Sequence, residues 1–325
     1  MTSPLRAAAL AVLATPLLAA GCAGGSGDLA AGEVVRAATD APAPGSPAAE
    51  RGWTAELQLP DGRLTARIAP LPGTEVDAAG TFADEAVSAD DDSTLVAVSW
   101  TTEAGAGVPT AAQTSVLDPS VPDELALVTG DGEDERRVPL EVDGLSRSAG
   151  FVYVALDDPA DWGLEVVFDG VAQSVTEDAA APHVDPAAQP LYDVPASAAA
   201  GYTSCRTTVT PAAFARTGGS AFCRARTASW PWVAGQGWSA DGPWRVVQLE
   251  TTLQPSGSAP VSATEVRASV DGRAPVATRD EDRGESGATS STLVFAPGGT
   301  RLEVRRTSTV GGDPVTLTGS LPLDR

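Results

Sequence analysis

The 43 carboxylates are the side chains of this sequence that remain available for chemistry. Some of them gather in four runs that look like turns, at residues 90–92, 131–135, 157–161 and 280–285. Two carboxylates about 5–10 Å apart would suffice for a glycosidase, and alternating oxygens suit calcium. None of the runs has the spaced D-x-[DN]-x-[DN]-G pattern, and acids in turns usually solubilise loops and protect sheet edges. We therefore expect no metal site, and a carboxylate-based envelope hydrolase stays an alternative.

The sequence lacks the residues that other catalytic mechanisms need. The single His, His183, stands between prolines in "APHVDP", whereas a Ser–His or Cys–His mechanism needs a rigidly held imidazole. The chain has no Lys, which removes Schiff-base chemistry, and it contains no nucleophile-elbow, zinc-protease or P-loop motif. Zinc prefers His and Cys ligands, which are scarce here. These observations predict a protein that is not an enzyme and needs no cofactor.

The stretch "SWPWVAGQGWSADGPW" holds four of the seven tryptophans. Trp230 and Trp232 flank a proline and would share one face of an extended chain. An aromatic platform of these two and Trp238, with Gln236 and Asp241 nearby, could bind a sugar ring or a protein partner. The alternative is that the indoles fill the core of a β-domain that has few other large side chains. Trp244 opens an apolar strand, so we expect it in the core.

The N-terminus has the anatomy of a secretory signal. One charged residue, Arg6, precedes an uncharged run at residues 7–20, which is too short for the roughly 20 residues of a membrane span. The run ends in "LAAGC" at Cys22, which resembles a bacterial lipoprotein signal, although Ala19 stands where that family usually has Leu. The resemblance implies removal of residues 1–21 and acylation of the Cys22 thiol by diacylglycerol. The protein would then be anchored to the outer face of the cell membrane, or be secreted if the Cys is incidental.

Cys205 and Cys223 are the two other cysteines, 18 residues apart. Disulfides persist outside the cytoplasm, so we predict that these two are bonded. A redox-active or metal-bound pair is the alternative, but a C-x-x-C motif and a nearby His are both missing.

The chain carries a formal net charge of −22, and all its basic residues are Arg. An excess of negative charge repels phosphate backbones and anionic lipid headgroups. We therefore expect no nucleic-acid partner.

Amino-acid composition divides the rest of the chain into four segments. Residues 22–52 are rich in Ala, Gly, Pro and Ser and predict a disordered tether that follows the lipidated Cys. Residues 53–177 show short alternating apolar runs with turn residues between them, typical of an antiparallel β-sandwich. An Ala- and Pro-rich stretch at 178–201 indicates a linker. Strand-like texture resumes at 202–325, the second β-sandwich, which holds the disulfide.

The two halves look like a degenerate repeat. "LVAVSWTT" at 95–102 aligns with "RVVQLETT" at 245–252, and the same offset aligns "TSV" at 114–116 with "TEV" at 264–266. "GLEVVF" at 163–168 corresponds to "RLEVRR" at 301–306. These matches predict two copies of one sandwich.

The layout resembles tandem immunoglobulin-like modules of the telokin-like type on actinobacterial lipoproteins. The resemblance is one of strand pattern only, and it implies a binding or scaffolding role. We therefore predict an all-β fold with two tandem antiparallel sandwiches, in a lipid-anchored, non-enzymatic protein of the cell envelope. Its partners would be the membrane, through the anchor, and envelope proteins or wall glycan. A glycan-binding module built on the tryptophan surface is the first alternative.

Overall fold

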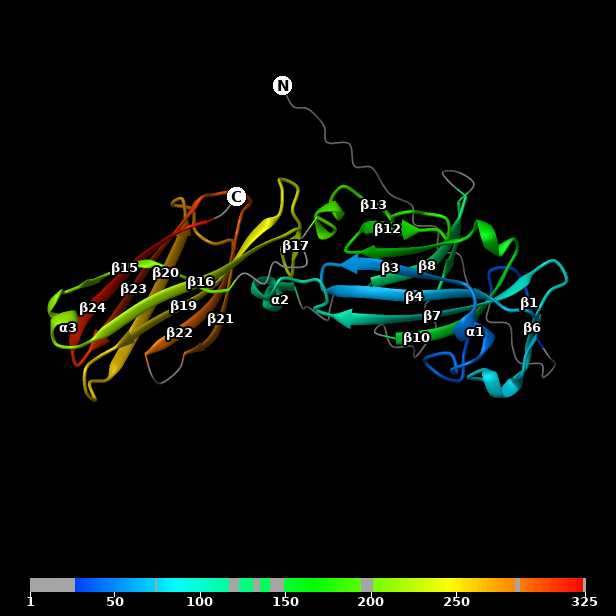
Figure 1. Ribbon diagram of the computed structural model, residues 1–325, viewed down its shortest axis with the longest axis horizontal. Helices are drawn as coiled ribbons and strands as arrows, with labels where there is room; N and C mark the ends of the chain where they lie inside the picture. Colours follow the sequence, from blue (N-terminus) through cyan, green and yellow to red (C-terminus); the bar gives the residue numbers. More distant parts are fainter. Residues whose placement is uncertain are drawn as a thin grey trace, which may run out of the picture.

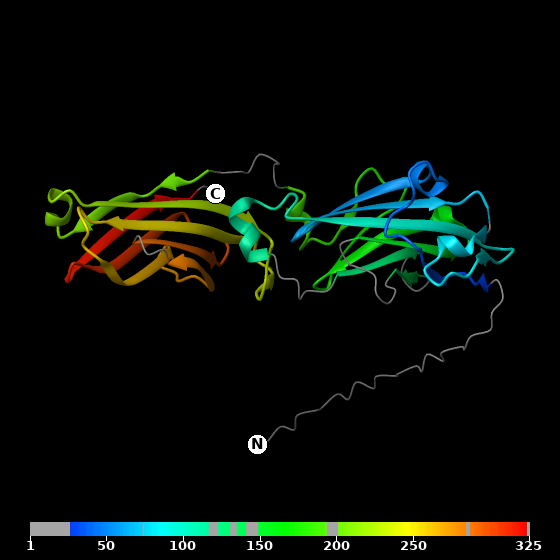
Figure 2. The ribbon, with the colours of Figure 1, turned by 90° about the horizontal axis from the view of Figure 1, so that it is seen from below.

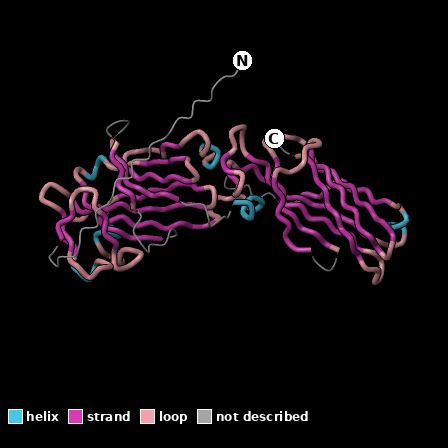
Figure 3. Tube along the Cα trace, turned by 180° about the vertical axis from the view of Figure 1, so that it is seen from behind, coloured by secondary structure: helices cyan, strands magenta, loops and turns pink. Residues whose placement is uncertain are grey.

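The protein forms two β-sandwiches placed end to end (Figures 1 and 2). Strands dominate both, and the helices are short (Figure 3). The first sandwich is built from residues 27–193 and the second from residues 201–323. The computed structural model describes residues 27–73, 75–116, 123–130, 135–140, 149–193, 201–283 and 287–323.

Two five-stranded sheets make up the first sandwich. One has the order β2 (Val34–Arg36), β10 (Ala149–Leu156), β7 (Thr94–Ala104), β4 (Gly62–Pro70), β3 (Trp53–Leu59). The other has the order β13 (His183–Val184), β12 (Val171–Val175), β11 (Gly163–Phe168), β8 (Asp123–Thr129), β9 (Arg136–Pro139). A small sheet of β1 (Gly27–Leu29), β6 (Val87–Ala89) and β5 (Glu75–Val76) lies at one end. The helices are α1 (Pro47–Glu50) and α2 (Thr110–Val116), with 3₁₀ turns at Ala78–Gly80, Pro159–Asp161 and Gln189–Leu191.

Alternation of apolar and polar residues explains the first core. In β3, Ala55, Leu57 and Leu59 are buried while the residues between them are not, as period-2 patterning requires. The hairpin to β4 pairs Leu57 with Leu64, so the buried rows of both strands coincide. Trp100 and Trp162 pack into the same core. The sheets therefore stack through the faces that the sequence pattern indicates.

The second sandwich has a five-stranded and a four-stranded sheet. The first is ordered β14 (Thr203–Ser204), β16 (Ser220–Trp230), β19 (Trp244–Gln254), β22 (Ala288–Phe295), β21 (Ala277–Arg283). The second is ordered β15 (Arg206–Thr210), β24 (Asp313–Pro322), β23 (Arg301–Val310), β20 (Val261–Val270). Helix α3 (Ala213–Arg216) connects β15 to β16, and β17 (Trp232–Val233) and β18 (Gly237–Trp238) form a separate two-stranded hairpin.

The predicted disulfide is confirmed. Cys205 and Cys223 are bonded, with a Cα–Cα distance of 5.3 Å, and both are buried in the second core. Cys205 lies between β14 and β15, where the chain passes from one sheet to the other, so the bond ties that crossing to β16.

The all-β fold with tandem sandwiches is likewise confirmed, and strand order supports the duplication. β7 and β19, the pair aligned from sequence, both occupy the centre of a five-stranded sheet. β11 and β23 also correspond, because each lies between its hairpin partner and an earlier strand. The short match at 114–116 was wrong, because those residues belong to α2 whereas 264–266 belong to β20.

In the first sandwich, β3, β4 and β7 are neighbours in one sheet, whereas the immunoglobulin constant-type order places the third strand in the opposite sheet.

The predicted tether was wrong where the structure describes it. Strand β1 pairs in parallel with β6, and β2 pairs with β10. Leu29, Ala37 and Ala48 are buried, so even this Ala-rich segment supplies enough apolar surface to join the fold. The signal peptide and Cys22 lie outside the described residues.

The predicted linker is also shorter than expected. His183, in β13, pairs with Ser174 of β12, and the His183 side chain is exposed. Farther on, the Tyr192 hydroxyl donates to Oε1 of Gln173 at 2.5 Å and accepts a bond from the backbone N–H of Gln58 at 3.1 Å. Burial raises the pKa of Tyr192. These bonds fix residues 183–192 to the first sandwich despite their Pro-rich composition.

Candidate functional site

The clustered tryptophans lie where the two sandwiches meet. Trp230 and Trp232 are completely buried. The Trp230 indole N–H donates to the Pro60 carbonyl at 2.9 Å, and the Trp232 N–H donates to Oδ2 of Asp169 at 2.7 Å. The half-buried Trp238 donates to the Phe168 carbonyl at 3.0 Å. Each of these indoles therefore belongs to the second sandwich and is satisfied by an acceptor from the first.

Apolar contacts complete this interface, which we call the tryptophan joint (Trp230, Trp232, Trp238 and α2). The Phe168 ring meets the rings of Trp232 and Trp238 edge to face, with centroids 5.0 and 6.3 Å apart. Helix α2 crosses the outer face of β16, β19 and β22, where Val108 and Ala112 pack in one cluster with the second sandwich. The residues they cover form one cross-strand row: Ala228, Val246, Val294 and Ala277.

The joint corrects the idea of a tryptophan recognition surface. Stacking on a sugar needs an open ring face, and the rings of Trp230 and Trp232 have none. Gln236 and Asp241 are exposed, but they lie on turns beside buried indoles rather than beside an aromatic platform. Trp244 is half-buried and donates to the Gly237 carbonyl at 3.0 Å. The indoles of this segment are therefore packed rather than displayed, as the alternative prediction held. The core that they fill, however, lies between the two domains.

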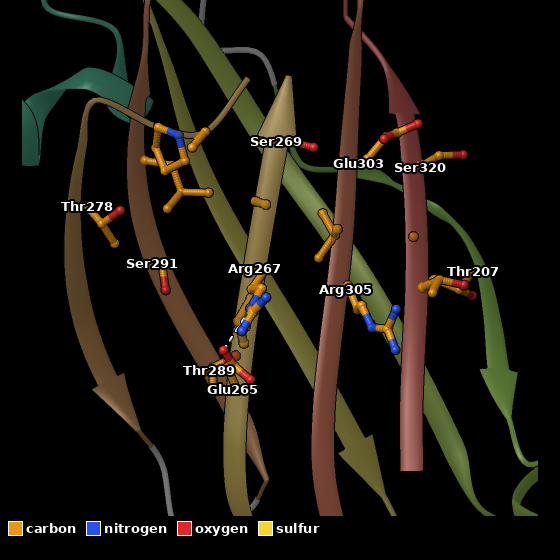
Figure 4. A pocket seen from close by; sticks show the side chains of 18 of the residues that line it. Thr207, Glu265, Arg267, Ser269, Thr278, Thr289, Ser291, Glu303, Arg305 and Ser320 are labelled. Carbon is orange, nitrogen blue, oxygen red and sulfur yellow. Dashed lines mark hydrogen bonds and ion pairs between the residues drawn. The ribbon is translucent and has the colours of Figure 1, made fainter. Parts of the chain in front are cut away.

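A groove of about 980 Å³ lies instead on the second sandwich (Figure 4). It is lined by six consecutive residues of the edge strand β20, so both faces and the free edge of that strand contribute. Its walls come from β15, β20, β21, β22, β23 and β24. The lining residues are Arg206, Thr207, Thr208, Thr264, Glu265, Val266, Arg267, Ala268, Ser269, Gly272, Ala274, Pro275, Thr278, Thr289, Ser290, Ser291, Leu293, Glu303, Val304, Arg305, Thr318, Gly319 and Ser320.

Strand register arranges the polar walls in rows. Arg267 lies opposite Arg305, which lies opposite Thr318. One pleat away, Ser269, Glu303 and Ser320 form a parallel row, and Arg206 ends it on β15. Figure 4 shows Ser269, Glu303 and Ser320 above Arg267 and Arg305. The sheet thus presents two polar rows across its strands.

The chemistry of the groove is that of hydroxyls and guanidinium groups. Ten of its lining residues are Ser or Thr, three are Arg and two are Glu. Arg267 Nε donates to Oε1 of Glu265 at 2.7 Å, whereas the described residues offer Arg305 no carboxylate within ion-pair distance. The lining contains neither His nor Cys. This set is suited to noncovalent recognition of a polar ligand.

A buried arginine lies behind the groove. The Arg306 side chain is completely inaccessible, and burial lowers its pKa to about 10, so it keeps its charge at neutral pH. Its guanidinium donates to the Thr251 carbonyl at 2.8 Å, to Ser308 Oγ at 3.1 Å and to Thr264 Oγ1 at 3.5 Å. Thr264 also lines the groove, so a groove hydroxyl is in direct contact with a buried cation.

Sequence interpretation missed this groove, although one signal was available. Residues 1–200 carry eight Arg against 32 Asp and Glu, a formal charge of −24, whereas residues 201–325 carry 13 Arg against 11 acids, a formal charge of +2. The overall charge of −22 therefore hides a second half that does not repel anions. Counting each half separately would have directed attention to its arginines.

Comparison of the chain with protein-family models, with curated proteins and with solved structures gave no match. Among the described residues, no helix is both long and apolar enough to cross a bilayer. Nor do those residues bring three or more His, Cys, Asp or Glu side chains close enough to hold a metal ion.

Proposed function

We propose that this protein is a lipid-anchored, non-enzymatic binding protein of the cell envelope that presents the groove of its second sandwich to a polar ligand. The groove carries the proposal, because it combines a volume of about 980 Å³ with hydroxyl and guanidinium walls. Small-molecule sites in proteins are typically concave, with volumes of about 300–1,000 Å³.

The position of the groove supports this role. β1, the first described strand, lies at the end of the first sandwich remote from the second (Figure 1). An anchor at Cys22 would therefore place the first sandwich nearer the membrane and the groove farther out. The buried disulfide supports an extracytoplasmic location, where such bonds persist.

The groove is tested by blocking it. The mature chain with Cys22→Ser, which carries no lipid, is sedimented with isolated cell-envelope fragments. We expect Thr318→Trp to reduce the bound fraction strongly, because Thr318 is exposed in the wall. The matched control is Thr316→Trp, on the same strand and the same outward side but outside the groove. Equal binding by both variants and the unchanged chain would refute the role of the groove.

The anchor is tested on the full precursor. Expression in a bacterial host should yield a membrane-associated chain whose N-terminal peptide has the mass of a diacylglyceryl-modified Cys22. The variant Cys22→Ser should appear in the soluble extracytoplasmic fraction. An unmodified N-terminal Cys22 peptide in the membrane-associated chain would exclude anchoring through this residue.

A further inference from the structure

Two arginines face each other across neighbouring strands in the groove. Arg267 on β20 and Arg305 on β23 are register partners on the outer face of the sheet, and both are exposed. Side chains directly opposite one another start about 4.5–5.5 Å apart, and like charges in that arrangement destabilise a sheet. Glu265 pairs with Arg267 only, at 2.7 Å. The pair therefore carries positive charge that the described residues do not fully compensate.

The surroundings add further positive charge. Arg206 stands at the β15 end of the neighbouring row, and the buried guanidinium of Arg306 lies behind Thr264. Glu303, in that same row, is the other lining acid. The groove thus has three lining arginines against two lining acids, on a chain whose overall charge is strongly negative. An anion would relieve the repulsion between Arg267 and Arg305 and could bind both groups at once.

The uncharged part of the lining indicates the rest of the ligand. Four lining hydroxyls stand in the two polar rows on the same outer face as the two arginines: Thr208, Ser269, Thr318 and Ser320. Hydroxyl side chains both donate and accept hydrogen bonds, which suits a partner that is itself rich in hydroxyls. The lining contains no aromatic ring, so stacking on a sugar face plays no part. Recognition would rest on hydroxyl contacts and on charge.

We infer that the groove binds an acidic sugar chain, with Arg267 and Arg305 together holding its anionic groups and the Ser and Thr side chains holding its hydroxyls. The inference rests on the proposed function, because it names the ligand class of the same groove. It also assigns the binding energy to the second sandwich alone, so the acidic first sandwich takes no part in contact with the ligand.

The test measures binding of oligogalacturonate, an acidic sugar chain, to the mature chain with Cys22→Ser, by isothermal titration calorimetry. Maltohexaose serves as the neutral sugar, and phosphatidylglycerol vesicles serve as an anionic surface without sugar. The double variant R267Q/R305Q removes the facing charges. The control R216Q/R224Q removes two arginine charges from the same sandwich outside the groove.

We expect R267Q/R305Q to weaken oligogalacturonate binding by about tenfold or more, since charge-assisted hydrogen bonds are lost. The control should bind as the unchanged chain does, and added salt should weaken binding. Equal loss in both double variants, or equal affinity for maltohexaose, would overturn the inference. So would binding to the vesicles but not to the sugar chain. Failure to bind oligogalacturonate while Thr318→Trp still blocks envelope binding would overturn the inference alone, and the proposed function would stand.

Discussion

The indole N–H of Trp232 reaches across the domain boundary and donates to Oδ2 of Asp169 at 2.7 Å. Asp169 holds a left-handed backbone conformation, with φ of 47°, which Asp tolerates better than most residues. The turn between β11 and β12 therefore presents its carboxylate to the second sandwich. Trp232 is completely buried whereas Asp169 is exposed, so the bond joins a buried donor to a carboxylate at the surface.

We predict that Trp232→Phe lowers the free energy of unfolding by about 1–3 kcal/mol, because a charge-assisted bond to Asp169 and part of a completely buried ring are both lost. Urea unfolding of the full chain measures this. Asp169→Gly supplies the matched background, since glycine adopts the same φ without strain. In that background Trp232→Phe should be milder by about 1 kcal/mol or more. The same penalty in both backgrounds would show that the bond contributes nothing.

A second prediction concerns the second sandwich expressed alone. Residues 201–325 contain four tryptophans, and removal of the first sandwich uncovers Trp230, Trp232 and the apolar row under α2. We expect red-shifted emission and strong acrylamide quenching from this fragment, provided that circular dichroism shows it folded. Addition of residues 27–193 in trans should shift the emission back toward blue. Blue, poorly quenched emission from the fragment alone would mean that these indoles pack within the second sandwich.

A third prediction concerns the disulfide. A Cβ added at Gly319 would lie 3.1 Å from Cys223 Sγ and 3.3 Å from Cys205 Cβ. Gly319→Ala should therefore destabilise the oxidised protein by about 1–3 kcal/mol through overpacking. In the background C205A/C223A the contact with Sγ is gone, although alanine keeps the Cβ at position 205, so the same substitution should cost clearly less, because Gly is a poor strand residue. Thermal unfolding of the four proteins checks this, and an unchanged penalty would contradict it.

The fourth prediction is a pH dependence. Asp61 lies next to Pro60 in the turn between β3 and β4, and its Oδ1 is buried without a hydrogen-bond partner among the described residues. Burial raises its pKa above the ordinary 3.8. The folded state therefore binds this proton more tightly than the unfolded state, so stability falls as pH rises from 3.8 through the folded pKa. Asp61→Asn should remove that decline and stabilise the protein at neutral pH. A Tm profile between pH 3 and 7 that is identical for both proteins would count against it.

The fifth prediction tests the buried arginine. A buried charge carries a large desolvation penalty, which Arg306 offsets, among the described residues, only through neutral acceptors. Each hydroxyl that Arg306 contacts has a second hydroxyl partner, since Thr264 and Ser308 are 2.9 Å apart and Thr251 and Thr289 are 2.7 Å apart. We therefore expect Arg306→Met to keep the free energy of unfolding within about 1 kcal/mol of the original or to raise it. A loss of several kcal/mol would show that the guanidinium is needed for folding.

The sequence predicted the parts of this fold that local patterns specify. Alternation predicted short strands from residue 53 onward, such as those that pair Leu57 with Leu64, and compartment arguments predicted the bond between Cys205 and Cys223. Composition failed in the Ala- and Pro-rich segments, because Tyr192 is held there by partners far away in sequence. The tryptophans were assigned to a surface or a core, but a domain interface has the same local pattern. The groove depends on strand register, which places Arg267 beside Arg305 although 38 positions separate them.

The tryptophan joint has a mechanical consequence. Hydrogen bonds at three indoles and the covering helix α2 fix both the tilt and the twist of one sandwich against the other. Because the two sandwiches then move as one rigid unit, rotating the first sandwich about its long axis turns the groove through the same angle. For a chain tethered at one end, the direction in which the groove opens would then be set by how the first sandwich rests near the anchor.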